Sequence, residues 1–137
     1  MKAKSISFFI LVLSIVFFFS SCSSDEVISL DSPDGRNHIV FILKDGVPYY
    51  RILREDRVVL DTSGLGFELK DMPALQGNFK MEKAVMSGKH ERWETVWGQW
   101  NKIWDHHSQL IVTLKEQSDP KRTLELEFKA FDDGVAF

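Results

Sequence analysis

Residues 110–115 read Leu-Ile-Val-Thr-Leu-Lys, and residues 124–129 read Leu-Glu-Leu-Glu-Phe-Lys. In both stretches large apolar side chains occupy every second position, a period typical of an antiparallel strand with one buried and one solvated face. Glu125 and Glu127 fall on the solvated face. Ser118-Asp119-Pro120 lies between the two stretches and consists of residues that favour turns. The two stretches therefore predict neighbouring half-buried strands joined by a turn.

The chain upstream shows the same pattern of short apolar stretches separated by turn residues. The expected strands are residues 38–44, 49–54, 58–60 and 64–69, and the expected turns are residues 31–35, 45–46 and 55–56. The stretch from His38 to Lys44 is β-branched and apolar at most positions, which suits a strand covered on both faces. Asp45-Gly46 is favoured in tight hairpins, because glycine adopts positive φ without strain. Strands at this spacing, with almost no helical pattern, predict an all-β fold of the β-sandwich class.

The N-terminus has the three parts of a lipoprotein signal peptide over residues 1–21. Two lysines give a basic start, an apolar run follows from Ile6 to Phe19, and Ser20-Ser21 precede Cys22. The apolar run has about 14 residues, fewer than the roughly 20 of a membrane-spanning helix, and an uncleaved anchor is the alternative. We expect acylation of Cys22 to hold the mature protein at the periplasmic face or the surface of the bacterial outer membrane.

The composition of the mature chain narrows the class of partner. Loss of residues 1–21 leaves 116 residues with 15 basic and 20 acidic side chains, a net charge of −5. No nucleic-acid partner is expected, because nucleic-acid binding relies on clustered Lys and Arg. Cys22 is the only cysteine, and its lipidation would leave no free thiol. Residues 22–30 are expected to form a polar tether and a first strand, and residues 31–137 a β-sandwich domain.

The tryptophans of the chain fall in one short segment. They are Trp93, Trp97, Trp100 and Trp104. Their spacing also fits a helix, although Gly98 and the β-branched pair Thr95-Val96 disfavour one. Packing in the core or on a sheet surface is favoured over a carbohydrate platform, in which indole faces would stack on sugar rings. The four indoles remain candidates for contact with carbohydrate.

Histidines and carboxylates form no recognisable constellation. The histidines near the tryptophans are His90, His106 and His107, and the nearby acidic residues are Glu91, Glu94, Asp105, Asp132 and Asp133. Adjacent residues of a strand point to opposite faces, so His106 and His107 would not bind one ion together, and no metal ligand is assigned. Glycosidases generally use two facing carboxylates, but no pair stands out. No nucleophile elbow, phosphate loop or dinucleotide fingerprint occurs, and no catalytic residue is assigned.

Five segments carry a resemblance to a known family. They are Ser32-Pro33-Asp34-Gly35 with the strand Ile39 to Lys44, Asp45-Gly46-Val47-Pro48-Tyr49-Tyr50, Leu65-Gly66-Phe67-Glu68-Leu69, Glu94-Thr95-Val96-Trp97-Gly98, and Phe131-Asp132-Asp133-Gly134-Val135-Ala136-Phe137. In this order and spacing they resemble the N-terminal domain of glycoside hydrolase family 97, over Asp31 to Phe137. Residues 92–95 and 106–110 depart from the family pattern, which leaves the substrate subclass open.

The resemblance implies a galactose-mutarotase-like β-supersandwich that packs on a (β/α)₈ barrel. It also implies an α-glucosidase or α-galactosidase of bacterial polysaccharide-utilisation systems, acting on α-linked oligosaccharides, with calcium in the full-length protein. The catalytic carboxylates and calcium ligands would lie beyond Phe137, so the domain would be truncated here and none is assigned to this sequence. Two alternatives stay open, namely a stand-alone carbohydrate-binding surface lipoprotein and a structural β-sandwich that contacts other proteins.

Overall fold

The computed structural model describes residues 25–99 and 102–137, and strands are the only regular elements in these ranges. The strands are β1 (Glu26–Asp31), β2 (Asn37–Lys44), β3 (Val47–Arg54), β4 (Arg57–Gly64), β5 (Phe79–Glu94), β6 (Lys102–Glu116), β7 (Thr123–Phe131) and β8 (Val135–Ala136). The described ranges contain no helix long and apolar enough to cross a membrane. The predicted signal peptide and Cys22 lie outside the described residues.

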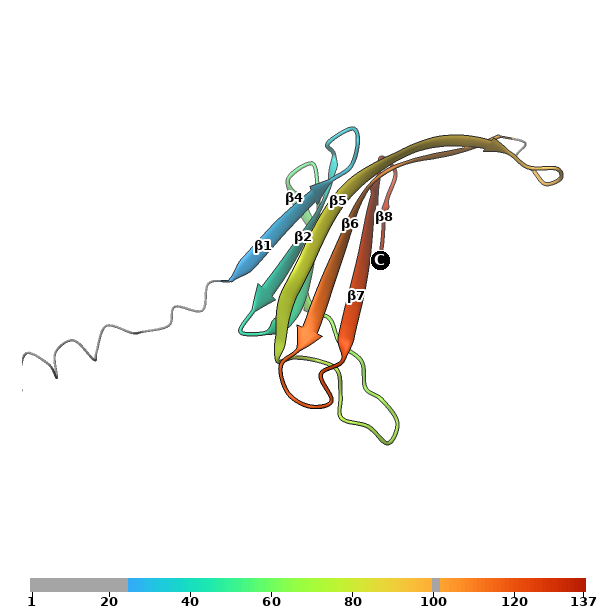
Figure 1. The fold of residues 1–137 in the computed structure, drawn as a ribbon. Coiled ribbons are helices and arrows are strands. Elements are labelled where there is room, and N and C mark those ends of the chain that lie inside the picture. Colours follow the sequence, from blue (N-terminus) through green and yellow to red (C-terminus); the bar gives the residue numbers. More distant parts are fainter. Residues whose placement is uncertain (1–24, 100–101) are drawn as a thin grey trace, which may run out of the picture.

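The strands form two four-stranded antiparallel sheets, each in the order of the sequence: β1-β2-β3-β4 and β5-β6-β7-β8. Figure 1 shows the two sheets as separate layers of the body of the molecule. β2 contacts β7 and β1 contacts β6 across the space between the layers. The fold is a β-sandwich, which confirms the all-β prediction made from strand spacing and turn residues.

The core lies between the sheets and follows the alternation of the sequence. Leu110, Val112 and Leu114 of β6 are fully buried, as is Phe128 of β7. From the other sheet, Phe41 of β2 reaches the Phe128 ring, with 5.9 Å between ring centroids. The period of two in residues 110–115 and 124–129 therefore identified the buried face of both strands correctly.

The second strand differs from its prediction. Ile39, Phe41 and Leu43 are buried, but Val40 and Ile42 on the opposite face are only half-buried. The expectation of a strand covered on both faces is therefore wrong for the described residues. The physical reason is that one sheet covers one face of β2, and the described chain supplies no further layer for the other face.

Two tight turns shape the first sheet as predicted. Asp45 and Gly46 have φ of 50° and 74° between β2 and β3, and Glu55 and Asp56 have φ of 48° and 61° between β3 and β4. Positive φ at both central residues suits the right-handed twist of a two-residue hairpin. Gly46 is also required by packing, because a Cβ there would lie 3.1 Å from the backbone of Phe79.

The stretch 64–69 is not the strand that its sequence predicted. β4 ends at Gly64; beyond it, the Leu65 N–H donates to the Pro48 carbonyl at 2.9 Å, and Phe67 forms an isolated bridge with Leu75. The bridge has two backbone hydrogen bonds, of 3.0 Å and 2.8 Å. Residues 65–78 therefore form a long loop, because a strand needs a partner along its whole length and Leu75 supplies one only at a single position.

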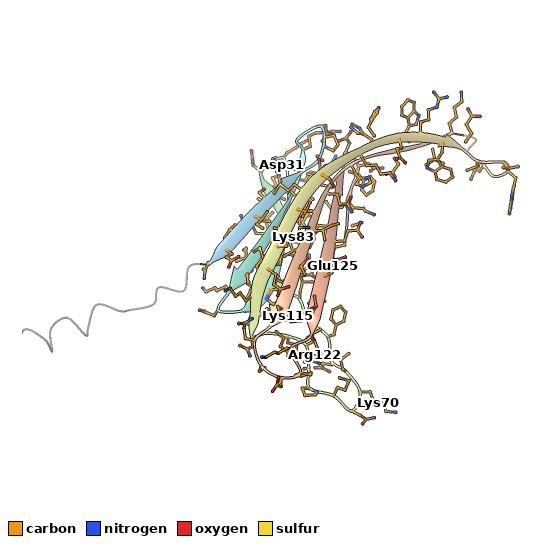
Figure 2. All side chains as sticks on the ribbon, viewed as in Figure 1. Asp31, Lys70, Lys83, Lys115, Arg122 and Glu125 are labelled. Atoms are coloured by element: carbon orange, nitrogen blue, oxygen red, sulfur yellow. The ribbon has the colours of Figure 1, made fainter. Side chains whose placement is uncertain are left out.

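The loop is held to the second sheet by a nearly buried ion pair. Arg122 donates to Glu116 at 2.7 Å and 2.8 Å, and it also donates to the backbone carbonyls of Pro73 at 2.8 Å and Ala74 at 3.3 Å. Figure 2 shows Arg122 at the end of the sandwich from which the loop with Lys70 projects. These contacts close this end of the core.

Candidate functional site: the aromatic arm

β5 and β6 continue beyond the sandwich as a two-stranded projection, which we call the arm and define as the described residues 90–99 and 102–106. β6 pairs with β7 as far as His107, which lies opposite Phe131. From Lys102 to His106, β6 pairs only with β5. Figure 1 shows the arm bending away from the two layers of the body. Trp100 lies outside the described residues.

The arm carries the other three tryptophans on its surface. The exposed fraction is 53% for Trp93, 89% for Trp97 and 61% for Trp104. Trp93 lies in β5 and Trp104 in β6, so the helical alternative is wrong. Packing in the core is wrong as well, and these two indoles lie on the surface of the two-stranded sheet, the other form of packing that was favoured. The reason is that the first sheet does not extend beneath the arm. Contact with carbohydrate stays a prediction for these residues.

Trp93 and Trp104 lie on opposite faces of the arm. Trp93 is paired with Ile103, and Trp104 is paired with Arg92. Directly paired residues of antiparallel strands share a face, whereas successive residues alternate. The structure therefore places one indole on each face, while Trp97 lies in the connection between the strands.

The Trp104 face carries Arg92, Trp104 and two histidines. The Arg92 guanidinium lies 5.1 Å from the centroid of the Trp104 ring, a cation–π distance. The His90 ring lies 4.6 Å from the ring of its partner His106 and 6.2 Å from Trp104. His106 Nδ1 is 3.9 Å from Asp132 Oδ2, which connects this face of the arm to the turn after β7.

The Trp93 face carries an ionic network at the base of the arm. Lys89 Nζ lies 2.9 Å from Asp105 and 3.2 Å from Glu91. Asp105 also lies 2.6 Å from Nδ1 of His107, whose ring is 4.8 Å from that of Phe131. His107 is 97% buried and His106 is exposed, so the prediction that these neighbours point to opposite faces is confirmed.

The charges of this network stabilise one another and hold the two strands together at the base of the arm. The Lys89 ammonium and then His107 hold the pKa of Asp105 below its usual range, and the hydrogen bonds to Asp105 and Glu91 raise the pKa of Lys89. A general acid for glycoside hydrolysis needs a raised pKa. Asp105, which is paired with Glu91 across the strands, is therefore arranged to bind Lys89 rather than to donate a proton.

Asp132 has a structural contact as well. Its Oδ1 accepts a hydrogen bond of 2.9 Å from the backbone N–H of Asp34, in the turn before β2. The Ser32 hydroxyl and the Arg36 backbone and side chain donate to Asp34 and hold its pKa far below the usual range. The opening turn and the turn after β7, two segments of the family resemblance, thus meet beside the base of the arm.

Sequence reasoning singled out the indoles and histidines but missed Lys89. The alternation of charged residues at 89, 91 and 105, with His107, would have indicated a polar cluster on one face of a hairpin. The described residues bring together no group of three His, Cys, Asp or Glu side chains able to hold a metal. Calcium takes six to eight oxygen ligands, so the described part of the chain does not fit the calcium that the resemblance implies.

Comparisons with known proteins agree with the resemblance. The family model described as "Glycosyl-hydrolase 97 N-terminal" matches residues 30–137. A glycoside hydrolase family 97 enzyme from Pseudoalteromonas sp. strain K8, in complex with panose, is similar at 30% identity and a TM-score of 0.74, covering 79% of this chain and 16% of that one. The complex with acarbose gives the same four values.

A β-arabinopyranosidase shares the fold at a TM-score of 0.68 and 15% identity, covering 79% of this chain and 17% of that one. The chain therefore spans 16% of the length of the family 97 enzymes above and 17% of the arabinopyranosidase. The family match over residues 30–137 includes every strand from β2 to β8. From this match, the chain belongs to glycoside hydrolase family 97 and carries the N-terminal domain of that family.

Proposed function

We propose that this chain is the non-catalytic N-terminal domain of an α-glucosidase or α-galactosidase that acts on α-linked oligosaccharides, and that it supports a catalytic barrel. The observation that carries the proposal is the family match across residues 30–137. The similar Pseudoalteromonas enzyme has been solved with panose and with acarbose, which supports a substrate of this class.

The chemistry of the described carboxylates supports a non-catalytic role. Glycoside hydrolysis takes two carboxyl groups across the scissile bond, one of them protonated near neutral pH. The pKa of Asp105 and that of Glu116 are both lowered, by Lys89 and by Arg122 respectively. Each of these carboxylates serves an ion pair of the domain, so the acid of the reaction is expected elsewhere in the enzyme.

Hydrolysis of p-nitrophenyl α-glucoside and α-galactoside tests this proposal. We expect the full-length polypeptide that carries this domain to cleave at least one of them. Purified residues 25–137 should cleave neither, because no acid and base face each other for hydrolysis among the described residues. Turnover by the pure domain would place the active site here. A full-length polypeptide inactive on both glycosides would contradict the α-glycosidase assignment.

A lipid anchor at Cys22 would hold this enzyme at the bacterial outer membrane, on its periplasmic side or at the cell surface. The support is the signal-like sequence of residues 1–21 and the small residues before Cys22. We expect Cys22→Ala to move the protein from the membrane fraction to the soluble fraction. Retention in the membrane would favour the uncleaved anchor.

The calcium expected in the full-length enzyme would be bound by parts of that enzyme outside the described residues.

The stand-alone sugar-binding lipoprotein is the second candidate, and the exposed indoles are the observation in its favour. The opposite faces of Trp93 and Trp104 count against it, because a flat platform needs neighbouring indoles on one side. The Arg92 guanidinium, moreover, already lies over the Trp104 ring. The enzyme domain is therefore the better supported of the two.

A further inference from the structure

We propose that the arm is a clasp that inserts into a crevice of the catalytic part of the same enzyme, so that protein covers both of its faces. This inference rests on the proposed function, because the occupant is the part of a family 97 enzyme that lies outside this domain. It assigns the tryptophans of the arm to a contact between domains and not to a sugar platform.

The arm exposes large apolar side chains on two faces and at its tip. Trp93 and Trp104 are each more than half exposed on opposite faces, and Val96 in the connection is 98% exposed. Figure 2 shows side chains projecting from both sides of the arm. Large apolar side chains that are exposed together on one projection are typical of contact sites. A flat partner would leave one indole in water, whereas a crevice covers both.

The base of the arm is braced on both faces. Lys89 joins Asp105 and Glu91 on the Trp93 face, and His106 approaches Asp132 on the Trp104 face. A two-stranded hairpin is marginally stable by itself in water. The bracing holds the direction of the arm, but the described residues offer nothing that covers its outer half. A projection with a fixed base and an uncovered outer half is what we expect of an element that binds a partner.

A buried ring nitrogen at the base provides a second observation. Nδ1 of His107 is hydrogen-bonded to Asp105 at 2.6 Å, which leaves Nε2 as the other polar atom of the ring. This Nε2 is buried and has no hydrogen-bond partner in the described part of the chain. Buried polar groups are nearly always paired in complete structures. A hydrogen-bonding group from the adjoining part of the enzyme would pair with it.

Charge and direction argue against a membrane as the occupant. The arm and its base carry balanced charges: Lys89, Arg92, Lys102, Glu91, Glu94 and Asp105. A balanced surface gains little from an anionic lipid layer, which attracts basic segments. Figure 1 also shows the start of β1 and the tip of the arm at opposite ends of the molecule, so a lipid at Cys22 would hold the tip away from the membrane.

The remainder of the enzyme is large enough to supply the crevice. This chain matches only 16% of the Pseudoalteromonas enzyme, so most of that polypeptide lies outside the matched domain. A second copy of this chain is the competing protein partner. An oligosaccharide is the competing small-molecule ligand. A second copy predicts contacts between two polypeptides, and an oligosaccharide predicts contacts that panose would displace. A crevice in the same enzyme predicts contacts within one polypeptide.

Photo-crosslinking in the full-length polypeptide tests the proposal. A photoreactive phenylalanine analogue replaces Trp93 in one variant, Trp104 in a second, and Val59 in a control that is exposed on β4, in the other sheet. We expect both arm positions to crosslink to peptides beyond residue 137 of the same polypeptide, with roughly tenfold the yield of position 59, because a buried residue touches many neighbours.

Three outcomes would overturn the clasp: crosslinks from only one face, crosslinks mainly to a second copy, or crosslinks abolished by saturating panose. If either variant fails to fold, Ile103 and Arg92 carry the probe on the same two faces. Activity on the two α-glycosides is measured in the same preparation. An active enzyme without crosslinks contradicts the clasp alone, and an inactive enzyme with crosslinks contradicts the proposed activity alone.

Discussion

The two ends of β6 have the same alternation but opposite environments. Leu110 is fully buried in the body, whereas Trp104, on the same face and in the same strand, is 61% exposed on the arm. The alternation decides only which side chains share a face, because it follows from strand geometry. Burial of that face depends on a second layer, which the first sheet supplies for the body and not for the arm.

The polar contacts of the two regions differ in the same way. In the body, Glu116 and Arg122 form a nearly buried pair that also binds the backbone of the loop at residues 73–74. At the base of the arm, the side chain of Lys89 is 42% exposed while it pairs with Asp105. The ion pair of the body is therefore largely shielded from water by the domain itself, whereas the ion pair at the base of the arm remains partly in solvent.

The largest difference between the body and the arm should appear in the free energy of unfolding when one aromatic residue is truncated in each region. In residues 25–137, we expect Phe128→Ala to cost about 3–5 kcal/mol of unfolding free energy, because it leaves a cavity beside Phe41. We expect Trp97→Ala to change it by less than about 0.5 kcal/mol, because this indole is 89% exposed. Guanidinium unfolding followed by far-UV circular dichroism compares the two variants. Equal costs would mean that the arm packs within this domain.

The sequence predicted the local features of this domain well. The alternation in residues 110–115 and 124–129 identified the core faces, and Asp45-Gly46 and Glu55-Asp56 were recognised as turns, because both signals depend on a few neighbouring residues. The stretch 64–69 was predicted as a strand, but only Gly64 lies in one, at the end of β4, and residues 65–69 belong to a loop. Its residues favour a strand, but the described chain provides only one bridge, between Phe67 and Leu75, and the loop is held by the hydrogen bond from Arg122 to the Pro73 carbonyl.

The environment of the arm could not be predicted from its spacing. The positions of Trp93 and Trp104 fit a helix, a core strand and an exposed hairpin alike, and only the length of the first sheet separates the last two. The contact between Asp34 and Asp132 was equally hidden, since 98 residues separate them in the chain. Features that depend on distant residues required the structure.

A smaller effect should distinguish the ion pair of the body from that of the arm. We expect Glu116→Gln to lower the thermal midpoint of residues 25–137 by several degrees near neutral pH, because it leaves the partly buried Arg122 without its charge partner. Asp105→Asn should lower it less, because Lys89 is more exposed and water screens the pair. Calorimetry measures both, with Glu125→Gln on the exposed face of β7 as the matched control.

The pH dependence of the Glu116→Gln effect on stability distinguishes the charge of the glutamate from its shape. Hydrogen bonds from Arg122 hold the pKa of Glu116 below its ordinary value of 4.5 in the folded chain. The pair therefore contributes its full stability above the ordinary value and loses it as the pH falls through the lower, folded value. The gap between the wild type and Glu116→Gln should narrow as the pH falls below 4.5 and through the lower, folded value. A gap that is the same at acid and neutral pH would show that the shape of the glutamate side chain, and not its charge, holds the loop against the sandwich.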